Sequence, residues 1–386
     1  MIDPEPIHFL DEDGTLNPSE TAAEFAAELD RLSLDDYRTW YADMLFARGF
    51  DQECTHLQRQ GQLALWAPAL GQEGAQVGAA HALQQADHVF PAYREHTVAR
   101  VRGVDLARIA AQFRGVTNGG WDVTDPKNGN FHFYTLVLGA QTLHASGFAL
   151  GQVLDAKARQ GSATLDPGEP GVATEAAALV FYGDGTTSQG ETNEALVFAA
   201  SYQSPTVFFV QNNRWAISVP VERQSRTPLY RRGLGAGMPS VQIDGNDPLA
   251  SYAVTRRFID EARDGQGPRF IEALTYRMGA HTTSDDPTRY RPAGELDQWH
   301  AKDPLVRFEK FLRDKGVEQS FFDETAAAAK QYALEQREII MSLPVPGPEF
   351  MFEHVYTDPH PRMNEQVDWL MRYENSFADD AEGGKA

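Results

Sequence analysis

The sequence has 386 residues, 42% of them apolar, which is enough for one large domain or two medium ones with a substantial core. Acidic residues outnumber basic ones by 55 to 34, and the net charge of −21 disfavours sequence-independent binding to nucleic acid or to an anionic membrane. The single cysteine, Cys54, excludes an intramolecular disulfide framework and a cysteine-based zinc site. No apolar run reaches the roughly 20 residues that cross a bilayer, and the acidic start is unlike a secretory or mitochondrial signal, so we expect a cytoplasmic protein.

The N-terminal part begins with residues 1–33, which mix Pro, Asp, Glu and Ala without apolar periodicity. We expect an arm there, either lying on another surface or frayed. A helix is predicted over 34–60, where aromatic and aliphatic residues recur at helical spacing and Ser33 can cap the first turn. Shorter helices are predicted over 74–84 and 106–113.

Four short apolar runs follow in the middle of the chain, at 178–182, 206–210, 241–243 and 270–276. Each run is bounded by Gly, Pro, Asn or Asp, and helical segments such as 191–202 separate them. Buried strands that alternate with helices are typical of βα units. The sequence therefore predicts an α/β fold with a parallel sheet and helices on both faces.

The C-terminal part contains two more predicted helices, over 306–312 and 323–341. The last segment, 378–386, is polar and contains Gly, so we expect it to be disordered. The expected organisation has three parts: an arm over 1–33, an α/β domain over 34–345 and a C-terminal extension over 346–386.

Polar residues follow two consecutive predicted strands. Gly183-Asp184-Gly185 comes directly after the first strand, and Asn213 follows the next. Parallel strands end at one edge of a sheet, where ligands bind, so Asp184 and Asn213 can face one ligand, and the glycines let the backbone approach a bulky anion. Carboxylate, amide and main-chain oxygens suit Mg²⁺, so the implied ligand is a magnesium diphosphate. The dipeptides Asp184-Gly185 and Asn212-Asn213 would each, if alone, more often be a simple turn, but their placement after two consecutive strands favours a ligand site.

The stretches 183–191 and 211–218 resemble the thiamine diphosphate motif in α subunits of 2-oxo acid dehydrogenase E1 components. The resemblance covers about 34–373 and implies a thiamine diphosphate-binding fold. It also implies that Asp184 and Asn213 are side-chain ligands of Mg²⁺ and that Trp215 supplies its main-chain carbonyl.

Other segments resemble the same family in the same order along the chain. The segment 90–94 resembles the one whose Tyr-Arg pair binds the diphosphate, which implies that role for Tyr93 and Arg94. The segment 136–141 resembles the one that holds the cofactor in its bent form. This assigns Leu138 to that contact, with a simple core leucine as the alternative.

The segment 277–281 lies just past the last predicted strand, and the mostly polar segment 282–291 follows it, which predicts a mobile loop at the mouth of the cofactor site. By resemblance, His281 is the active-site histidine and Arg277 binds the diphosphate; from the residues alone, His281 could also be a solvated histidine. A histidine can donate to, or exchange a proton with, an oxyanion or a thiolate. Thr282 stands where some relatives carry a phosphorylated serine, so we expect no regulation by that route.

Two further features have an open interpretation. Gly147 and Gly151 lie four residues apart on one predicted helix face. The resemblance implies a subunit interface there, whereas close internal packing would explain them equally. Glu73 is interpreted as structural, because two-subunit E1 enzymes take the glutamate beside the aminopyrimidine ring from the β subunit.

The resemblance implies an E1 α subunit that works with a β subunit as an α₂β₂ heterotetramer. It would carry out thiamine-dependent oxidative decarboxylation of a 2-oxo acid and transfer the acyl group to the lipoyl arm of E2. The segments 284–292 and 302–308 most resemble those of bacterial pyruvate dehydrogenase α subunits, which implies pyruvate as the substrate. Branched-chain relatives share much of this loop, so 3-methyl-2-oxobutanoate is the alternative. A non-catalytic scaffold paralogue is a third hypothesis, which retention of the candidate site residues disfavours.

Overall fold

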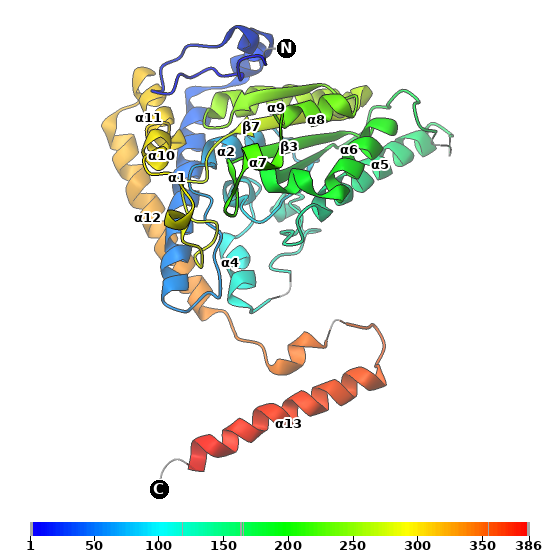
Figure 1. The fold of residues 1–386 in the computed structure, drawn as a ribbon, viewed down its shortest axis with the longest axis vertical. Helices are drawn as coiled ribbons and strands as arrows, with labels where there is room; N and C mark the ends of the chain where they lie inside the picture. Colours follow the sequence, from blue (N-terminus) through cyan, green and yellow to red (C-terminus); the bar gives the residue numbers. More distant parts are fainter. Residues whose placement is uncertain (1–2, 118, 163, 165, 354, 384–386) are drawn as a thin grey trace.

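The computed structural model describes residues 3–383 except 118, 163, 165 and 354, and a parallel sheet lies at its centre (Figure 1). The sheet has five strands in the order β1-β2-β3-β7-β6. They are β1 (His88–Phe90), β2 (Ala178–Gly183), β3 (Thr206–Asn212), β6 (Ser240–Asp244) and β7 (Arg269–Leu274). A small antiparallel hairpin, β4 (Trp215–Ala216) with β5 (Val219–Pro220), follows β3. The predicted α/β fold is confirmed, and β1 is the one strand of the parallel sheet that the sequence analysis did not predict.

Successive residues of the buried strands point into two cores. Val180 and Tyr182 belong to a core with the helices α5 (Ala140–Arg159), α6 (Gly190–Ser201) and α8 (Tyr230–Gly235). Leu179 and Phe181 belong to the larger core on the other face. That core includes α1 (Leu34–Arg59), α2 (Glu73–His81), α3 (His96–Val101) and α9 (Pro248–Glu261). Helices cover both faces of the sheet, so the central strands β2 and β3 contain continuous apolar runs rather than alternating apolar and polar residues.

The long helix α1 begins where the sequence predicts. The Ser33 side chain accepts a hydrogen bond from the Asp36 N–H, and Asp36 accepts one from the Ser33 N–H. This reciprocal capping box satisfies backbone donors that the first turn would otherwise leave free. The other helices are α4 (Leu106–Arg114), α7 (Val221–Gln224), α10 (Glu295–His300), α11 (Pro304–Asp314), α12 (Gln319–Ser342) and α13 (Pro361–Gly383).

The N-terminal arm lies on the body of the protein. Ile7 pairs with Ile243 at the β6 edge of the sheet. Shortly after it along the chain, the N–H groups of Phe9 and Leu10 donate to Asp247 Oδ2, at 2.6 and 2.9 Å. The 3-10 helix η1 (Glu20–Arg31) then packs against α9. The arm thus covers a sheet edge, with its unpaired backbone groups, that would otherwise be exposed.

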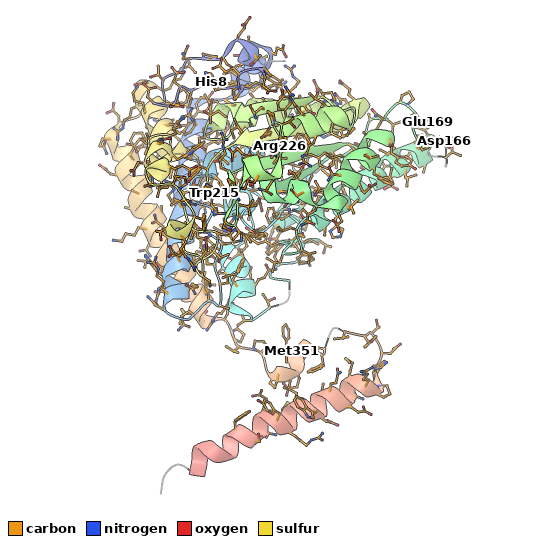
Figure 2. All side chains as sticks on the ribbon, viewed as in Figure 1. His8, Asp166, Glu169, Trp215, Arg226 and Met351 are labelled. Carbon is orange, nitrogen blue, oxygen red and sulfur yellow. The ribbon has the colours of Figure 1, made fainter. Side chains whose placement is uncertain are left out.

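The C-terminal extension leaves the body after α12. Its last helix, α13, lies apart from the rest of the ribbon in Figure 1. Figure 2 shows Met351 in the connecting segment and Trp215 within the body. The segment 378–386 was predicted to be disordered, but in the structure it is helical as far as Gly383, where α13 ends. Residues 384–386 lie outside the described residues. Among the residues that the structure describes, no helix has the length and apolar content that crossing a membrane requires.

Candidate active site

A cavity of about 200 Å³ lies at the carboxyl ends of β2 and β3. The two strands are parallel neighbours, and Gly183 pairs with Gln211, so the residues that follow both strands emerge at one edge of the sheet. All the site residues predicted from the sequence line this cavity: Tyr93, Arg94, Leu138, Gly183, Asp184, Gly185, Asn213, Trp215, Arg277 and His281.

Asp184 and Asn213 supply the oxygen donors of the cavity. Asp184 is 2% exposed, and its Oδ2 accepts a hydrogen bond from Gln224 Nε2 at 2.9 Å. Burial raises the pKa of its carboxyl to about 6. Asn213 Oδ1 accepts from the Trp215 N–H at 3.3 Å, and its Nδ2 donates to Gln72 Oε1 at 3.2 Å.

The glycines on the two sides of Asp184 differ in the space around them: Gly185 is closely packed, whereas Gly183 is not. A Cβ at Gly185 would lie 2.8 Å from the Cβ of Ala216, so only glycine fits between η3 (Asp184–Ser188) and the β4–β5 hairpin. A Cβ at Gly183 would meet no atom within 4 Å. The Gly183 backbone is therefore open to the cavity.

The β4–β5 hairpin turns two carbonyl groups toward Arg277. Arg214 and Ile217 have φ angles of 73° and 56°, a left-handed conformation that is unfavourable for residues other than glycine. Arg277 Nη1 donates to the Trp215 carbonyl at 2.8 Å, and Nη2 donates to the Ile217 carbonyl at 2.7 Å. These bonds hold the strained hairpin against the wall of the cavity.

Arg94 and Arg277 are buried cations without carboxylate partners. They are 6% and 1% exposed, and among the described residues neither has an acidic oxygen within 4 Å. Arg94 donates to the Pro68 carbonyl at 2.7 Å and to His281 Nδ1 at 3.0 Å. Arg277 Nε has no hydrogen-bond partner among the residues that the structure describes. Burial and the nearby Arg94 lower the pKa of Arg277 to about 10. Buried charge of this kind is costly unless an anion compensates it.

His281 is a neutral hydrogen-bond acceptor on its Nδ1 side. Burial and the two arginines lower its pKa to about 3. Because a guanidinium can only donate, Nδ1 must accept from Arg94, which places the ring proton on Nε2. The loop that carries His281 is held by polar contacts: the His281 N–H donates to Asp285, and Tyr290 accepts from Arg277.

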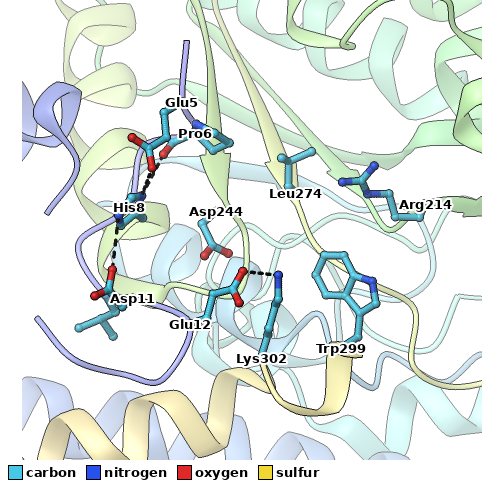
Figure 3. A pocket seen from close by; sticks show the side chains of 11 residues that line it. Glu5, Pro6, His8, Asp11, Glu12, Arg214, Asp244, Leu274, Trp299 and Lys302 are labelled. Carbon is cyan, nitrogen blue, oxygen red and sulfur yellow. Dashed lines mark hydrogen bonds and ion pairs between the residues drawn. The ribbon is translucent and has the colours of Figure 1, made fainter. Parts of the chain in front are cut away.

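A second cavity, of about 350 Å³, lies between the N-terminal arm and Trp299 (Figure 3). It is larger, yet its charged side chains have partners: Lys302 contacts Glu12, and Glu5 and Asp11 each lie 3.9 Å from His8. None of the predicted site residues lines it. The smaller cavity, with its unpaired arginines, is therefore the better candidate for an anionic ligand.

The smaller cavity fits a magnesium diphosphate. Two buried donors that have no partner in the described part of the chain, Gln72 Nε2 and Arg277 Nε, lie in its wall beside two cations and two oxygen-bearing side chains. The Trp215 carbonyl already accepts from Arg277, but a carbonyl has a second lone pair that a metal ion can use. Leu138 is 37% exposed and faces the cavity, which rules out the alternative of a simple core leucine.

Several residues of the cavity wall were not predicted from the sequence: Gln72, Glu95, Gln211, Ile217 and Gln224. Gln211 and Ile217 lie within the motif stretch 211–218, and Glu95 directly follows the segment 90–94, so these motifs were the available signal. Gln72 and Gln224 come from separate segments, and no local pattern marks them.

The structure also bears on the two open interpretations. Glu73 lies outside the cavity and accepts from Arg48 Nε at 2.8 Å and from the Gly71 N–H at 2.8 Å, which supports a structural role. A Cβ at Gly147 or Gly151 would meet no atom within 4 Å, so close internal packing is the wrong explanation for these glycines.

An α/β sheet with such a cavity at its carboxyl edge is typical of proteins that bind phosphate-bearing cofactors. The chain matches the family described as dehydrogenase E1 component over residues 41–337. The 3-methyl-2-oxobutanoate dehydrogenase subunit alpha of Mycobacterium tuberculosis is 40% identical, over 96% of this chain and 94% of the relative. The pyruvate dehydrogenase E1 component subunit alpha of Bacillus subtilis is 38% identical, over 75% of this chain and 74% of the relative. That of Bacillus cereus is 36% identical, over 79% of each chain.

The chain therefore belongs to the dehydrogenase E1 component family, as an α subunit of a 2-oxo acid dehydrogenase. The resemblance inferred from the sequence is confirmed. Thiamine diphosphate is the cofactor that this family implies.

Proposed function

We propose that this α subunit binds thiamine diphosphate through Mg²⁺ in the cavity at the ends of β2 and β3. With a β subunit in an α₂β₂ heterotetramer, it decarboxylates a 2-oxo acid and passes the acyl group to the lipoyl arm of E2. The observation that carries the proposal is the pair of buried arginines, Arg94 and Arg277, without an acidic oxygen within 4 Å in the described part of the chain. They lie beside the oxygen donors of Asp184 and Asn213 in one cavity.

Each residue has a role that follows from its chemistry. Asp184, Asn213 and the Trp215 carbonyl would hold Mg²⁺, whereas Arg94 and Arg277 would neutralise the diphosphate. When bound, thiamine diphosphate supplies the thiazolium that accepts the electrons left after decarboxylation.

Three other side chains complete the assignment on the α chain. The guanidinium of Arg94 lies 5.1 Å from the ring centroid of Tyr93. The Tyr93 hydroxyl would donate a hydrogen bond to the diphosphate. Leu138 would support the bent cofactor from the cavity wall. His281, with its proton on Nε2, would donate a hydrogen bond during acyl transfer to the lipoyl disulfide.

The test is calorimetric titration of the coexpressed αβ complex with thiamine diphosphate, with and without Mg²⁺. We expect Mg²⁺-dependent binding, decarboxylation of a 2-oxo acid with an artificial electron acceptor, and no activity from α alone. Equal activity from purified α would contradict the need for a β subunit. A correctly assembled complex that gives no binding heat would favour the scaffold hypothesis.

For the substrate, one comparison favours a branched-chain 2-oxo acid. The similarity to the 3-methyl-2-oxobutanoate dehydrogenase subunit spans 96% of the chain, whereas that to the Bacillus subtilis pyruvate dehydrogenase subunit spans 75%. We therefore propose 3-methyl-2-oxobutanoate as the substrate, and pyruvate, which the sequence analysis favours, as the second candidate. A higher kcat/KM for pyruvate in the reconstituted complex would reverse this order. The cytoplasmic location stays a prediction from the sequence.

A further inference from the structure

Glu95, to which the proposed function gives no role, lies in the wall of the cavity with 1% of its surface exposed. Its Oε1 accepts a hydrogen bond from Gln211 Nε2 at 2.6 Å, and its Oε2 accepts from the main-chain N–H of Arg94 at 3.1 Å. No cationic side chain in the described part of the chain lies within 4 Å of this carboxylate. Its direct partners are therefore two uncharged N–H donors, one of which belongs to the backbone of Arg94.

Gln76 completes the arrangement. Its Nε2 donates to Gln211 Oε1 and to the main-chain carbonyl of Arg94, each at 3.0 Å, and its Oε1 accepts from the Thr97 N–H at 3.1 Å. The peptide groups on the two sides of Arg94 are thus fixed by Glu95 and by Gln76. Buried networks of this kind are rigid when every member has its partners, because any displacement leaves a polar group unpaired.

The network joins two halves of the candidate site that are distant in the sequence. Arg94 lies just before α3, whereas Gln211 belongs to β3 and lies two residues before Asn213. Glu95 and Gln76 each link the Arg94 main chain to the Gln211 side chain, and Glu95 is the charged member of the pair. The position of the Arg94 main chain is therefore tied to the strand that presents Asn213.

We propose that Glu95 is a positioning residue, which fixes Arg94 relative to the end of β3 so that Arg94 and Asn213 meet one metal–diphosphate group together. This inference rests on the proposed function. Holding both binding groups in place before the ligand arrives removes an ordering cost from binding. Loss of the link therefore weakens cofactor binding more than it slows turnover at saturating cofactor.

The first test is Glu95→Gln in the assembled αβ complex. The glutamine has the same shape but one acceptor oxygen, whereas two N–H donors face the side chain, so one donor meets an NH₂ group. We expect the calorimetric Kd for thiamine diphosphate in the presence of Mg²⁺ to rise about tenfold or more. The KM for the cofactor rises in parallel, while kcat at saturating cofactor stays within about twofold of wild type.

The second test is a rescue. The double variant Glu95→Gln/Gln211→Glu exchanges the amide and the carboxylate. The amide at position 95 can then accept from the Arg94 N–H and donate to position 211, where the new carboxylate also accepts from Gln76. We expect the Kd to return to within about threefold of wild type, whereas general damage to the fold would not be repaired by a second substitution.

Glu28→Gln is the matched control, because Glu28 is also buried, at 6% exposed, but pairs with Arg257 away from the cavity. It should lower the thermal midpoint without changing the Kd. If Glu95→Gln does not assemble, Gln76→Met removes the donor to the Arg94 carbonyl and should raise the Kd in the same way. An unchanged Kd in the measured variant, or failure of the rescue, overturns the inference. Absence of binding by the wild-type complex would instead refute the proposed function, and the inference with it.

Discussion

At the scale of single residues, Asp184 is the side chain on which metal binding depends most directly. It is the one carboxylate in the proposed ligand set, and the other proposed ligands are neutral oxygens. We expect Asp184→Ala to abolish Mg²⁺-dependent binding of thiamine diphosphate. The fold should survive, because the lost partner, Gln224, is half-buried and a single hydrogen bond contributes about 1 kcal/mol.

Calorimetry measures the binding, and the thermal midpoint of the assembled complex measures the stability. Asp286→Ala is a suitable control, since Asp286 is exposed and makes only local hydrogen bonds in the neighbouring loop. Binding by Asp184→Ala at wild-type affinity would remove Asp184 from the ligand set.

His281 offers a prediction of a different kind. Its Nδ1 is committed to Arg94, so the chemistry left to it is donation from Nε2. His281→Ala should leave the cofactor Kd within about threefold of wild type and lower turnover coupled to E2 by about a hundredfold or more. Decarboxylation measured with an artificial electron acceptor should fall much less. Complex-coupled turnover at the wild-type level would show that the assigned role is wrong.

The sequence predicted the contiguous parts of this site because each motif sits at the end of a strand. Asp184 and Asn213 could be placed together by the rule that parallel strands end at one edge. The bridge between Glu95 and Gln211 could not be predicted in the same way, since the two residues are 116 positions apart and the motif that contains Gln211 does not indicate its side-chain partner. Side-chain partners of this kind depend on the packing of α2, α3 and β3, which no local sequence rule determines.

At the scale of elements, the N-terminal arm depends on Asp247. This residue caps α9 through Oδ1, which accepts from the Leu249 N–H at 2.9 Å, while Oδ2 accepts from the N–H groups of Phe9 and Leu10. One carboxylate therefore starts a helix and anchors the arm.

Replacing Asp247 should release the arm. We expect Asp247→Ala to lower the free energy of unfolding by about 2–4 kcal/mol, because it removes a helix cap and leaves two arm N–H groups unpaired. Proteolytic cleavage within 1–33 should become faster. Asp13→Ala, which removes an exposed acidic group from the same arm, is the control and should change neither quantity appreciably. An arm that stays resistant in Asp247→Ala would show that Ile7 and the other contacts suffice.

The long helix α1 and four of the five strands of the parallel sheet were predicted, whereas the three-residue strand β1 was not. The prediction of a helix over 34–60 agrees with α1, which spans Leu34–Arg59, since a long amphipathic pattern and a capping serine mark it. Strand β1 has three residues and is defined by pairing with β2, which leaves too little sequence for a period to be visible. The attachment of the arm to β6 likewise depends on backbone hydrogen bonds that carry no side-chain signature.

At the scale of the whole molecule, exposed apolar residues lie on α5 and α6. Leu143 and Leu154 on α5 are 38% and 40% exposed, and Val197 on α6 is 53% exposed. Gly147 lies on the same face of α5, and a Cβ there would meet no atom of the other described residues within 4 Å. Exposed apolar side chains on these neighbouring helices support the proposed association with other subunits.

The pH dependence of stability is also a property of the whole molecule, because buried groups of opposite type act against each other. Burial lowers the pKa of His88, His96 and His132 to about 4, 3 and 4. Their contribution to stability is present above the unfolded-state pKa of about 6.5 and is lost as the pH falls toward 4. Burial raises the pKa of Asp51 to about 7, so its contribution is present below about pH 4 and is lost as the pH rises through 7.

Two substitutions should therefore change the pH profile in opposite directions. His132 stacks on Phe90 with ring centroids 4.0 Å apart, so His132→Phe can keep the packing while removing a titrating group. In the assembled complex, the thermal midpoint at pH 7.5 minus that at pH 5.0 should become a few degrees smaller than wild type in His132→Phe. In Asp51→Asn the same difference should become larger, because the cost of ionising the buried carboxylate at pH 7.5 is gone. Each variant is compared with itself at two pH values, so any loss of stability that does not depend on pH cancels. Shifts of the same sign in both variants would show that these groups do not control the acid stability of the protein.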